Sequence, residues 1–355
     1  MSHTYYPLHQ GGENNASNMT MDMTDASCPI AAPQLMYTLT SHLGSPSSLS
    51  FSPSGQLLAT ASSDSTLTLW SLSTGSHLHT FSPRPTQISG CGSGINAISW
   101  SSDSTYIATA SDDHTIKVFS IVTHRLVRTF SEHTSFVLCL AFNAQSTLLV
   151  SGSFDETVRL WNVGRNKCHR TIAAHSEAVS GVHFNRDGTM IVSCSYDGLI
   201  RLWDTTTGQC LKTLVHKDQS AIGGVEFTPS GGQLLSSSLD STVRMWDIFN
   251  SKIVKTYTGH TNLKLPLTAQ LAFHPGSKQN SQRIATVLSA SEEGKVLMWH
   301  TQSKEKVVEW QAHKESVIAV TVHPTRNILA TASTELENAV RVWFFPAPTQ
   351  GIIES

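Results

Sequence analysis

The stretch from His183 to Trp203, HFNRDGTMIVSCSYDGLIRLW, contains the pattern that decides the fold. It alternates short apolar runs with two turn sequences, Asn-Arg-Asp-Gly at 185–188 and Tyr-Asp-Gly at 196–198. Extending the stretch to Val179 and to Leu214 adds one more run on each side, VSGVHF and CLKTL. Short apolar runs separated by Asp-Gly turns are typical of β-strands joined by tight hairpins. The segment therefore predicts four strands.

This segment is one copy of a repeat that runs through the chain. Runs that end on an aromatic residue recur at intervals of 42 to 53 residues, at Trp70, Phe119, Trp161, Trp203, Trp246, Trp299 and Trp343. Six residues before each aromatic stands an acid: Asp64, Asp113, Asp155, Asp197, Asp240, Glu293 and Glu337. Four residues before each acid stands a hydroxyl: Thr60, Thr109, Ser151, Ser193, Ser236, Ser289 and Ser333. A histidine precedes the aromatic by 28 residues in three copies and by more in three others, in the order His42, His133, His175, then His216, His260, His313.

Histidine, hydroxyl, acid and aromatic can form one hydrogen-bonded tetrad in each copy. The acid accepts from the imidazole, the imidazole bonds the hydroxyl, and the hydroxyl accepts from the indole N–H. Buried polar groups need such partners, and an orphaned group costs roughly 1–3 kcal/mol. We assign structural tetrads to His42, Thr60, Asp64 and Trp70, to His133, Ser151, Asp155 and Trp161, and to His175, Ser193, Asp197 and Trp203. The second copy has Cys91 and Phe119 instead, so its version should be weaker.

Seven units of about 42 residues with four strands each match the blades of a WD-repeat propeller. The predicted fold is all-β, a seven-bladed propeller over residues 34–346. The last copy has no apolar run after Trp343, whereas Leu35–Leu39 (LMYTL) is similar to the fourth strands of other copies. We therefore expect this N-terminal strand to complete the last blade and close the ring. Residues 1–33 are polar and lack Lys and Arg, which predicts a disordered tail, and residues 347–355 form a short C-terminal tail.

Composition excludes several classes of function. Twenty-four basic and 26 acidic residues give a net charge of −2, which argues against a protein that binds nucleic acid directly. No apolar run reaches the roughly 18 residues that span a membrane, and the N-terminus does not resemble a secretory signal. The six cysteines are scattered without paired spacing, which favours a reducing compartment, the cytosol or the nucleus.

Catalytic and metal chemistry find little support in the pattern. Ser, His and Asp recur together, but a hydrolase needs one such group and this chain repeats it in almost every copy. Cys168 and His169 are adjacent, yet no second pair stands at ligand spacing, so we predict no metal site and no cofactor. A propeller enzyme that uses the axial cavity is the alternative from another class, and a channel mutation that abolished turnover would identify it.

One position varies while the framework stays constant. The residue before the acid is Ser63, Asp112, Phe154, Tyr196, Leu239, Glu292 or Leu336. Variation on a constant repeat indicates the binding face of such assemblies. Tyr196 and Asp112 would offer an aromatic face and a carboxylate to a cation.

Beyond the general WD pattern, the chain resembles one family closely. The motifs SGSFDE (Ser151–Glu156), HFNRDG (His183–Gly188) and SYDG (Ser195–Gly198) are similar to those of the propeller subunit of COMPASS/MLL-type histone H3 lysine-4 methyltransferase complexes. Fungal members are the closer match. The overall pattern covers about residues 35–345, and the match is weaker in the first, fifth and sixth copies.

The resemblance implies two binding sites. One is an axial mouth that takes an arginine side chain between aromatic rings; the matching positions are Ser47, Asn96, Asp112, Leu138, Ser180, Tyr196 and Ile318. Leu138 replaces a clamping phenylalanine, and Lys264–Gln270 (KLPLTAQ) lacks the aromatics expected opposite it, so we expect weak binding of arginine peptides. The other site is a groove between blades five and six for a second propeller subunit, matched by Met245, Phe273 and Gln302.

The resemblance further implies a non-catalytic nuclear scaffold that docks a SET-domain methyltransferase, a second WD-repeat subunit and, as a further candidate, the histone H3 tail. A WD-repeat scaffold of another nuclear complex, for splicing or general transcription, is the alternative. A ubiquitin-ligase receptor is disfavoured because the W-D-x-R motif common in such proteins is absent at Trp203–Thr206 and at Trp246–Phe249.

Overall fold

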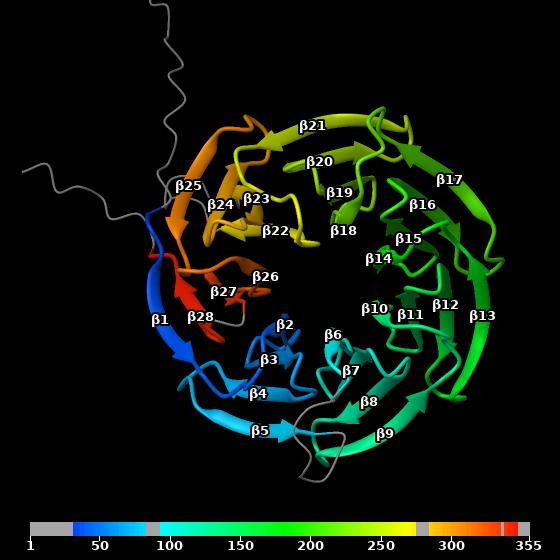
Figure 1. Ribbon diagram of the computed structural model, residues 1–355, viewed down its shortest axis with the longest axis horizontal. Coiled ribbons are helices and arrows are strands. Elements are labelled where there is room, and N and C mark those ends of the chain that lie inside the picture. The colour runs from blue at the N-terminus through cyan, green and yellow to red at the C-terminus, as the bar shows by residue number, and fades with distance from the viewer. Residues whose placement is uncertain (1–30, 83–92, 275–283, 335–336, 347–355) are drawn as a thin grey trace, which may run out of the picture.

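The computed structural model describes residues 31–82, 93–274, 284–334 and 337–346. These residues form 28 strands, which pair into seven four-stranded antiparallel sheets. The sheets stand around a central axis as the blades of a propeller (Figure 1). The predicted all-β, seven-bladed architecture is confirmed.

Blades one to six each contain four consecutive strands, ordered from the axis outward. Blade one contains β2 (Pro46–Phe51), β3 (Leu57–Ser62), β4 (Leu67–Ser71) and β5 (His77–Phe81). Blade two contains β6 (Ile95–Trp100), β7 (Tyr106–Ser111), β8 (Ile116–Ser120) and β9 (Arg125–Phe130). Blade three contains β10 (Val137–Phe142), β11 (Leu148–Ser153), β12 (Thr157–Asn162) and β13 (Lys167–Ala173).

The second half of the chain repeats this order. Blade four contains β14 (Val179–Phe184), β15 (Met190–Ser195), β16 (Leu199–Asp204) and β17 (Cys210–Val215). Blade five contains β18 (Ile222–Phe227), β19 (Gln233–Ser238), β20 (Thr242–Asp247) and β21 (Lys252–Thr258). Blade six contains β22 (Ala269–His274), β23 (Ile284–Ala290), β24 (Lys295–His300) and β25 (Lys306–Gln311).

Blade seven joins the two ends of the described chain. Its inner strands are β26 (Val317–Val322), β27 (Ile328–Ser333) and β28 (Val340–Phe344), and its outermost strand is the N-terminal β1 (Gln34–Leu39). Strand β1 pairs antiparallel with β28, with Leu35 opposite Trp343 and Leu39 opposite Val340. The predicted closure of the ring by an N-terminal strand is therefore confirmed.

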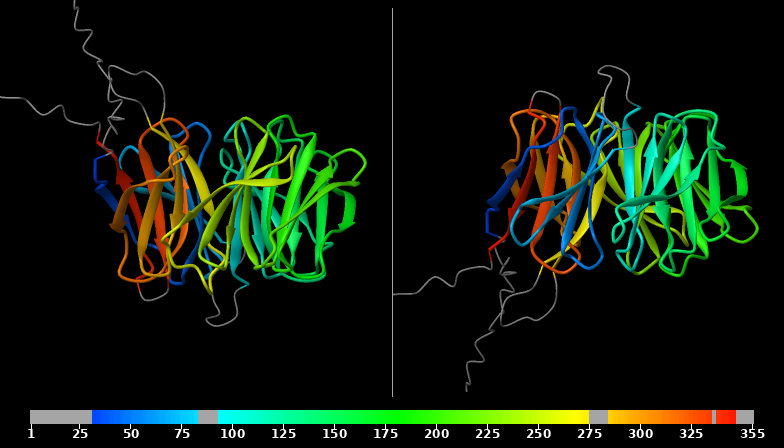
Figure 2. Two further views of the ribbon diagram at one scale, coloured as in Figure 1. Left: turned by 90° about the horizontal axis from the view of Figure 1, so that it is seen from above. Right: turned by 90° about the horizontal axis from the view of Figure 1, so that it is seen from below.

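The apolar core lies between the blades. In the cluster between blades three and four, Val150 and Leu160 pack with Phe184 and Trp203, and all four side chains are buried. A sheet that is apolar on both faces needs a neighbour on each side, and the closed ring supplies one to every blade. Seen from the edge, the molecule is a disc in which the turns collect on two faces (Figure 2). Recognition by this fold therefore falls to the turns and the axial channel.

One position on the outermost strand ties neighbouring blades together at the rim. The residue at this position pairs, across the strand ladder, with the residue just before the tryptophan of the third strand. In four blades its side chain donates a hydrogen bond to a backbone carbonyl of the next blade. The pairs are Tyr37 and Ser73 at 3.1 Å, Arg170 and Thr206 at 2.8 Å, Lys212 and Ile248 at 2.7 Å, and Lys255 and Thr301 at 2.7 Å. In blade one this position is His79, whose ring instead stacks on His124 of blade two, with the centroids 4.2 Å apart.

Most of the two predicted tails, at residues 1–30 and 347–355, lies outside the described residues. Within the described ranges, no helix is both long and apolar enough to cross a membrane.

Candidate functional site

The tetrads predicted in blades three and four are hydrogen-bonded networks. In blade three, Nδ1 of His133 lies 2.8 Å from Oδ2 of Asp155, and its Nε2 lies 2.7 Å from Oγ of Ser151. The indole of Trp161 donates to the same hydroxyl at 2.8 Å. Blade four repeats the arrangement, with distances of 2.9, 2.8 and 2.9 Å among His175, Asp197, Ser193 and Trp203. All these histidine and hydroxyl groups are buried, so they stabilise the blade and are not available to a ligand.

Blade one forms a modified tetrad. Its His42 bonds Thr60 at 2.7 Å, and Trp70 donates to the same hydroxyl at 3.0 Å. The other ring nitrogen of His42 lies 2.9 Å from the hydroxyl of Thr66 and 3.5 Å from the carboxylate of Asp64. A threonine hydroxyl thus stands between the imidazole and the acid.

Blade seven corrects one sequence assignment. The expected hydroxyl was Ser333, but His313 bonds Thr331 at 2.7 Å, and Trp343 donates to Thr331 at 3.0 Å. The acid is Glu337 as expected, 3.2 Å from His313. The hydroxyl is selected by the strand ladder, because Thr331 lies opposite Arg341 as Ser151 lies opposite Arg159 in blade three.

Two further expected histidines do not join a tetrad. His216 of blade five lies 3.2 Å from Asp218 instead, while Trp246 still donates to Ser236. His260 of blade six is 4% exposed and, among the described residues, neither of its ring nitrogens has a hydrogen-bond partner. Cys91, expected in the weaker tetrad of blade two, lies outside the described residues.

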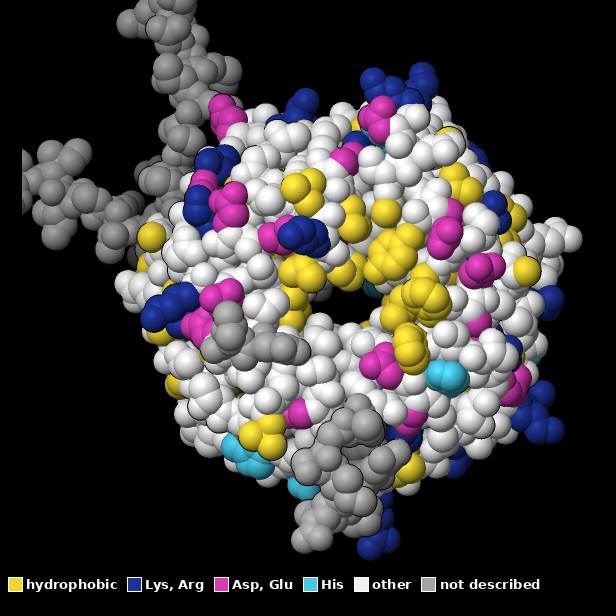
Figure 3. All heavy atoms as spheres, viewed as in Figure 1, with side chains coloured by type: hydrophobic (Ala, Val, Ile, Leu, Met, Phe, Trp, Pro, Cys, Tyr) yellow, Lys and Arg dark blue, Asp and Glu magenta, His cyan; other side chains and the backbone are white. Residues whose placement is uncertain are grey.

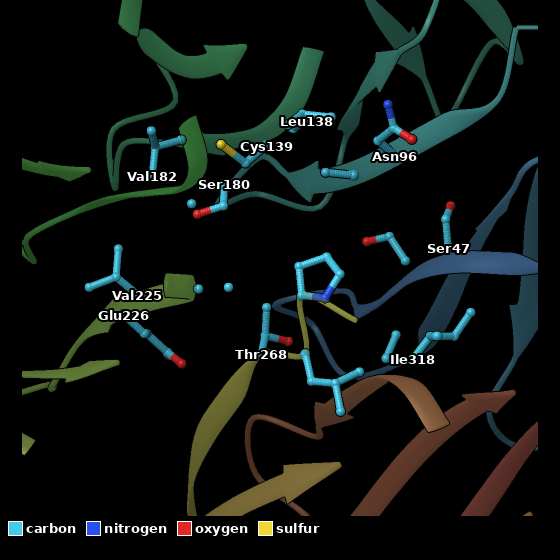
Figure 4. A pocket seen from close by; sticks show the side chains of 18 of the residues that line it. Ser47, Asn96, Leu138, Cys139, Ser180, Val182, Val225, Glu226, Thr268 and Ile318 are labelled. Atoms are coloured by element: carbon cyan, nitrogen blue, oxygen red, sulfur yellow. The ribbon is translucent and has the colours of Figure 1, made fainter. Parts of the chain in front are cut away.

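A channel of about 470 Å³ lies at the centre of the ring, lined by the first strands of the blades. Six of the seven residues predicted for the axial mouth line it: Ser47, Asn96, Leu138, Ser180, Tyr196 and Ile318 (Figure 4 labels five of them). The seventh, Asp112, lies beside the channel and accepts a hydrogen bond from Nδ2 of Asn96 at 2.7 Å. The structure thus brings the predicted mouth residues together around one opening (Figure 3).

The polar residues of the mouth also connect the blades. Ser47, Asn96 and Ser180 occupy the second position of the innermost strand in their blades. Each donates to the first backbone carbonyl of the next innermost strand, with Asn96 reaching Val137 at 3.0 Å. Leu138 and Ile318 stand at the same position without a donor. These three polar side chains therefore stabilise the contact between neighbouring blades.

The wall opposite Leu138 is a well-anchored loop without aromatic rings. One carboxylate oxygen of Glu292 accepts from the backbone N–H groups of Leu263, Lys264 and Leu265, at 2.9, 2.6 and 2.9 Å. Burial by itself would raise the pKa of Glu292, but these three bonds hold it below its ordinary value. The segment Lys264–Gln270 was predicted to face the mouth, and its residues from Leu265 to Gln270 line the channel. Strand β22 already begins at Ala269.

Two exposed rings, Phe136 and Phe154, lie close together in blade three, and sequence reasoning missed the first of them. Phe136 and Phe154 are 45% and 56% exposed, and their centroids lie 6.3 Å apart. Phe136 directly precedes the innermost strand β10, and Phe154 directly follows β11. Apolar side chains gather beside the central opening on the face seen in Figure 3. Phe154 stands in the variable position before the acid, which the sequence analysis assigned to the binding face, whereas Phe136 lies outside the repeated pattern.

The second predicted groove is not assembled as expected. Met245 is 2% exposed and packs in the core between blades five and six, so a partner cannot reach it. Phe273 is 43% exposed and lies beside Arg326 and Phe345 of blade seven. Gln302 is exposed in the turn between β24 and β25, where its backbone carbonyl accepts from Lys255. Buried strand residues repeat in every blade, so their match to a partner groove carried little information.

A deeper level of the channel was also missed. Glu226, the fifth residue of β18, lines it, as does His183 at the fifth position of β14. Burial raises the pKa of Glu226 to about 7 and lowers the pKa of His183 to about 4. The side chain of Glu226 points into the channel (Figure 4). Comparing equivalent strand positions across the copies would have revealed an acid where the others carry neutral residues.

Comparison with known families agrees with this geometry. The family model described as the WDR5 β-propeller domain matches residues 38–344, from the closing strand β1 to the end of β28. The match spans most of the chain and includes all seven blades. The chain therefore belongs to the WDR5 β-propeller family.

Proposed function

We propose that the protein is a non-catalytic scaffold of a nuclear histone H3 lysine-4 methyltransferase complex of the SET1/COMPASS type. The family match over residues 38–344 carries this proposal, because members of this family are protein-binding WD-repeat scaffolds. The buried tetrads support it, since repeated Ser, His and acid groups serve the framework of several blades. In this proposal the propeller docks a SET-domain methyltransferase subunit, a second WD-repeat subunit and the histone H3 tail.

The axial mouth is the proposed contact for the methyltransferase subunit or the histone tail. Tyr196 offers an aromatic face there, and the carboxylate of Asp112 accepts a hydrogen bond from Asn96, which lines the same channel. With Leu138 and a loop without rings on the two sides, we propose weak binding of an arginine side chain. For the second WD-repeat subunit, Phe273 and Gln302 remain candidate contacts, without the buried Met245.

Affinity purification with mass spectrometry tests the proposal. The tagged chain should recover a SET-domain protein and a second WD-repeat protein from nuclear extract. Tyr196→Ala should lose the SET-domain protein and keep the second WD-repeat protein. Tyr106→Ala is the matched control, because Tyr106 begins β7, is 40% exposed and does not line the channel. Recovery of splicing or general transcription subunits, with no SET-domain protein, would show that the proposal is wrong.

A further inference from the structure

The channel has two levels of side chains. In blades one to five and in blade seven, the second residue of the innermost strand, such as Ser47 or Asn96, forms the mouth, and the fifth residue forms a lower level about 10 Å further along the strand. In blade six, strand β22 begins only at Ala269, and its second residue, Gln270, stands at the lower level. At the lower level, three side chains accept a backbone N–H of the next blade. Ser99 accepts from Phe142 at 3.1 Å, His183 from Phe227 at 3.3 Å, and Gln270 from Val322 at 3.1 Å.

Glu226, the fifth residue of β18, makes no such bond. Among the described residues its carboxylate has no hydrogen bond and no ion pair, although the side chain is largely buried and lines the channel. No lysine or arginine is among the residues that line the channel. His183, on the neighbouring blade, cannot serve as a cation near neutral pH, because burial holds its pKa at about 4. A buried carboxylate without a counter-ion is costly, and a bound cation relieves that cost.

The remaining lining supports a small cationic ligand. The volume of about 470 Å³ lies within the range of pockets that hold small molecules. Burial raises the pKa values of Cys139 and Tyr196, the other titratable lining groups, so both stay neutral near pH 7. Glu226 is therefore the lining group whose charge changes between pH 6 and pH 8.

We propose that the lower level of the axial channel binds a cationic group, a guanidinium or an ammonium, with the carboxylate of Glu226 as its counter-ion. The cationic group enters through the mouth. The ion pair with Glu226 below the mouth then supplies part of the binding energy that an aromatic ring in place of Leu138 would supply. The inference rests on the proposed function only for the source of the cation, a side chain of a partner protein. A free small cation would satisfy the same chemistry.

Calorimetry with defined probes tests this site in the full-length protein. The probes are a short peptide with one central arginine, the same peptide with lysine, the same peptide with neutral citrulline, and free methylguanidinium. The arginine and lysine peptides should bind at pH 8 and about tenfold more weakly at pH 6, where Glu226 is mostly protonated. The citrulline peptide should bind at least about tenfold more weakly than the arginine peptide at pH 8.

Variants assign the effect to the carboxylate. Glu226→Gln keeps the shape of the side chain, and it should weaken arginine-peptide binding about tenfold at pH 8 and remove its pH dependence. Glu177→Gln is the matched control, because Glu177 is exposed, directly precedes the Ala178–Val179 segment of blade four and does not line the channel. It should behave like the unmodified protein. Methylguanidinium that binds as tightly as the peptide would identify a free cation as the source, and weaker binding would identify a side chain.

Three results would overturn the inference: no binding of any cationic probe at pH 8, equal affinity for the arginine and citrulline peptides, or the same pH dependence in Glu226→Gln. The inference and the proposed function fail separately. A SET-domain protein that is still recovered with Glu226→Gln, together with any of these results, would leave the scaffold role intact and remove the cation site.

Discussion

The hydroxyl of Ser151 holds two other buried side chains of blade three. Asp155 can only accept from Nδ1 of His133, so Nε2 of that ring is the acceptor for the Ser151 hydroxyl. The same oxygen accepts from the indole of Trp161. One hydroxyl therefore satisfies a ring nitrogen and an indole N–H in the interior, where neither can turn to water.

Ser151→Ala should orphan both groups. The expected loss of stability is roughly 2–4 kcal/mol, since each unsatisfied buried group costs roughly 1–3 kcal/mol. Ser289→Ala is the matched control: Ser289 is also buried and stands at the same position of blade six, but within the described part of the chain its hydroxyl donates only to the carbonyl of Ala290. The midpoint of thermal unfolding at a fixed scan rate measures the difference. Equal shifts for the two variants would contradict the tetrad argument.

Leu138 determines how strongly the mouth can hold an arginine side chain. Leu138→Phe would add a ring face at the channel, and a cation–π contact is worth about 0.5–2 kcal/mol. We expect a histone H3 N-terminal peptide to bind roughly 2- to 30-fold more tightly to this variant in calorimetry. Leu126→Phe on the exposed outer strand β9 is the control and should change nothing. An unchanged affinity for Leu138→Phe would mean that the ring does not reach the guanidinium.

At the scale of strands, the ladder explains why blade seven departed from the sequence template. The tetrad hydroxyl lies opposite the residue two before the tryptophan, as for Thr331 and Arg341 or Ser193 and Arg201. The number of residues between the hydroxyl and the acid increases when the turn between the two strands is longer. Counting four residues back from Glu337 therefore selected Ser333, whereas the tetrad contains Thr331. Register across a strand pair fixes which side chains meet, and a count along the chain follows it only when turn lengths are equal.

The seam between blades one and two lacks the hydrogen bond found at four other seams. His79 stacks on His124 there, and burial, together with His124 and His77, lowers the pKa of His79. Its folded pKa is below the unfolded value of 6.5, so the stability of this seam is present above pH 6.5 and is lost as pH falls.

His79→Lys should restore a hydrogen bond to the turn of blade two, as Lys212 does between blades four and five. We expect a gain of about 1 kcal/mol at pH 7.5, since the position is partly exposed, and a larger gain at pH 5.5. Thermal unfolding at the two pH values measures it. Leu78→Lys, at an exposed position of the same strand, is the control. A gain that does not grow at the lower pH would contradict the role assigned to the stacked rings.

At the scale of the whole molecule, the repeat made the fold predictable and left the sites harder to predict. Each copy carries the same aromatic, acid and hydroxyl, so seven weak signals add up to one architecture. The mouth residues were placed through the family resemblance, and the structure shows that five of them share one strand position: Ser47, Asn96, Leu138, Ser180 and Ile318. Comparison of the copies could have singled out Glu226 as an acid, but not its lack of a partner among the described residues, which only the assembled ring reveals.

The buried histidines predict how the whole ring responds to acid. Burial lowers the pKa values of His183, His260 and His313 to about 4, against 6.5 in the unfolded chain. Between pH 6.5 and pH 4 the unfolded chain therefore binds more protons, and stability falls as pH falls. Each histidine can remove up to about 3 kcal/mol, which is a large share of the 5–15 kcal/mol typical of folded proteins.

Glu226 acts in the opposite direction, because its folded pKa of about 7 exceeds the ordinary 4.5. Its destabilising charge is fully present above pH 7 and is relieved as pH falls to 4.5, which offsets about one histidine. We expect the urea midpoint to be highest between about pH 6 and 8 and to fall steeply below pH 6. His260→Phe replaces a ring that packs against Trp299 and has no hydrogen-bond partner among the described residues. It should reduce the fall of the urea midpoint below pH 6, whereas His169→Phe at an exposed position should not. If the urea midpoint falls equally below pH 6 in the unmodified protein and in His260→Phe, burial of this ring does not control the pH response.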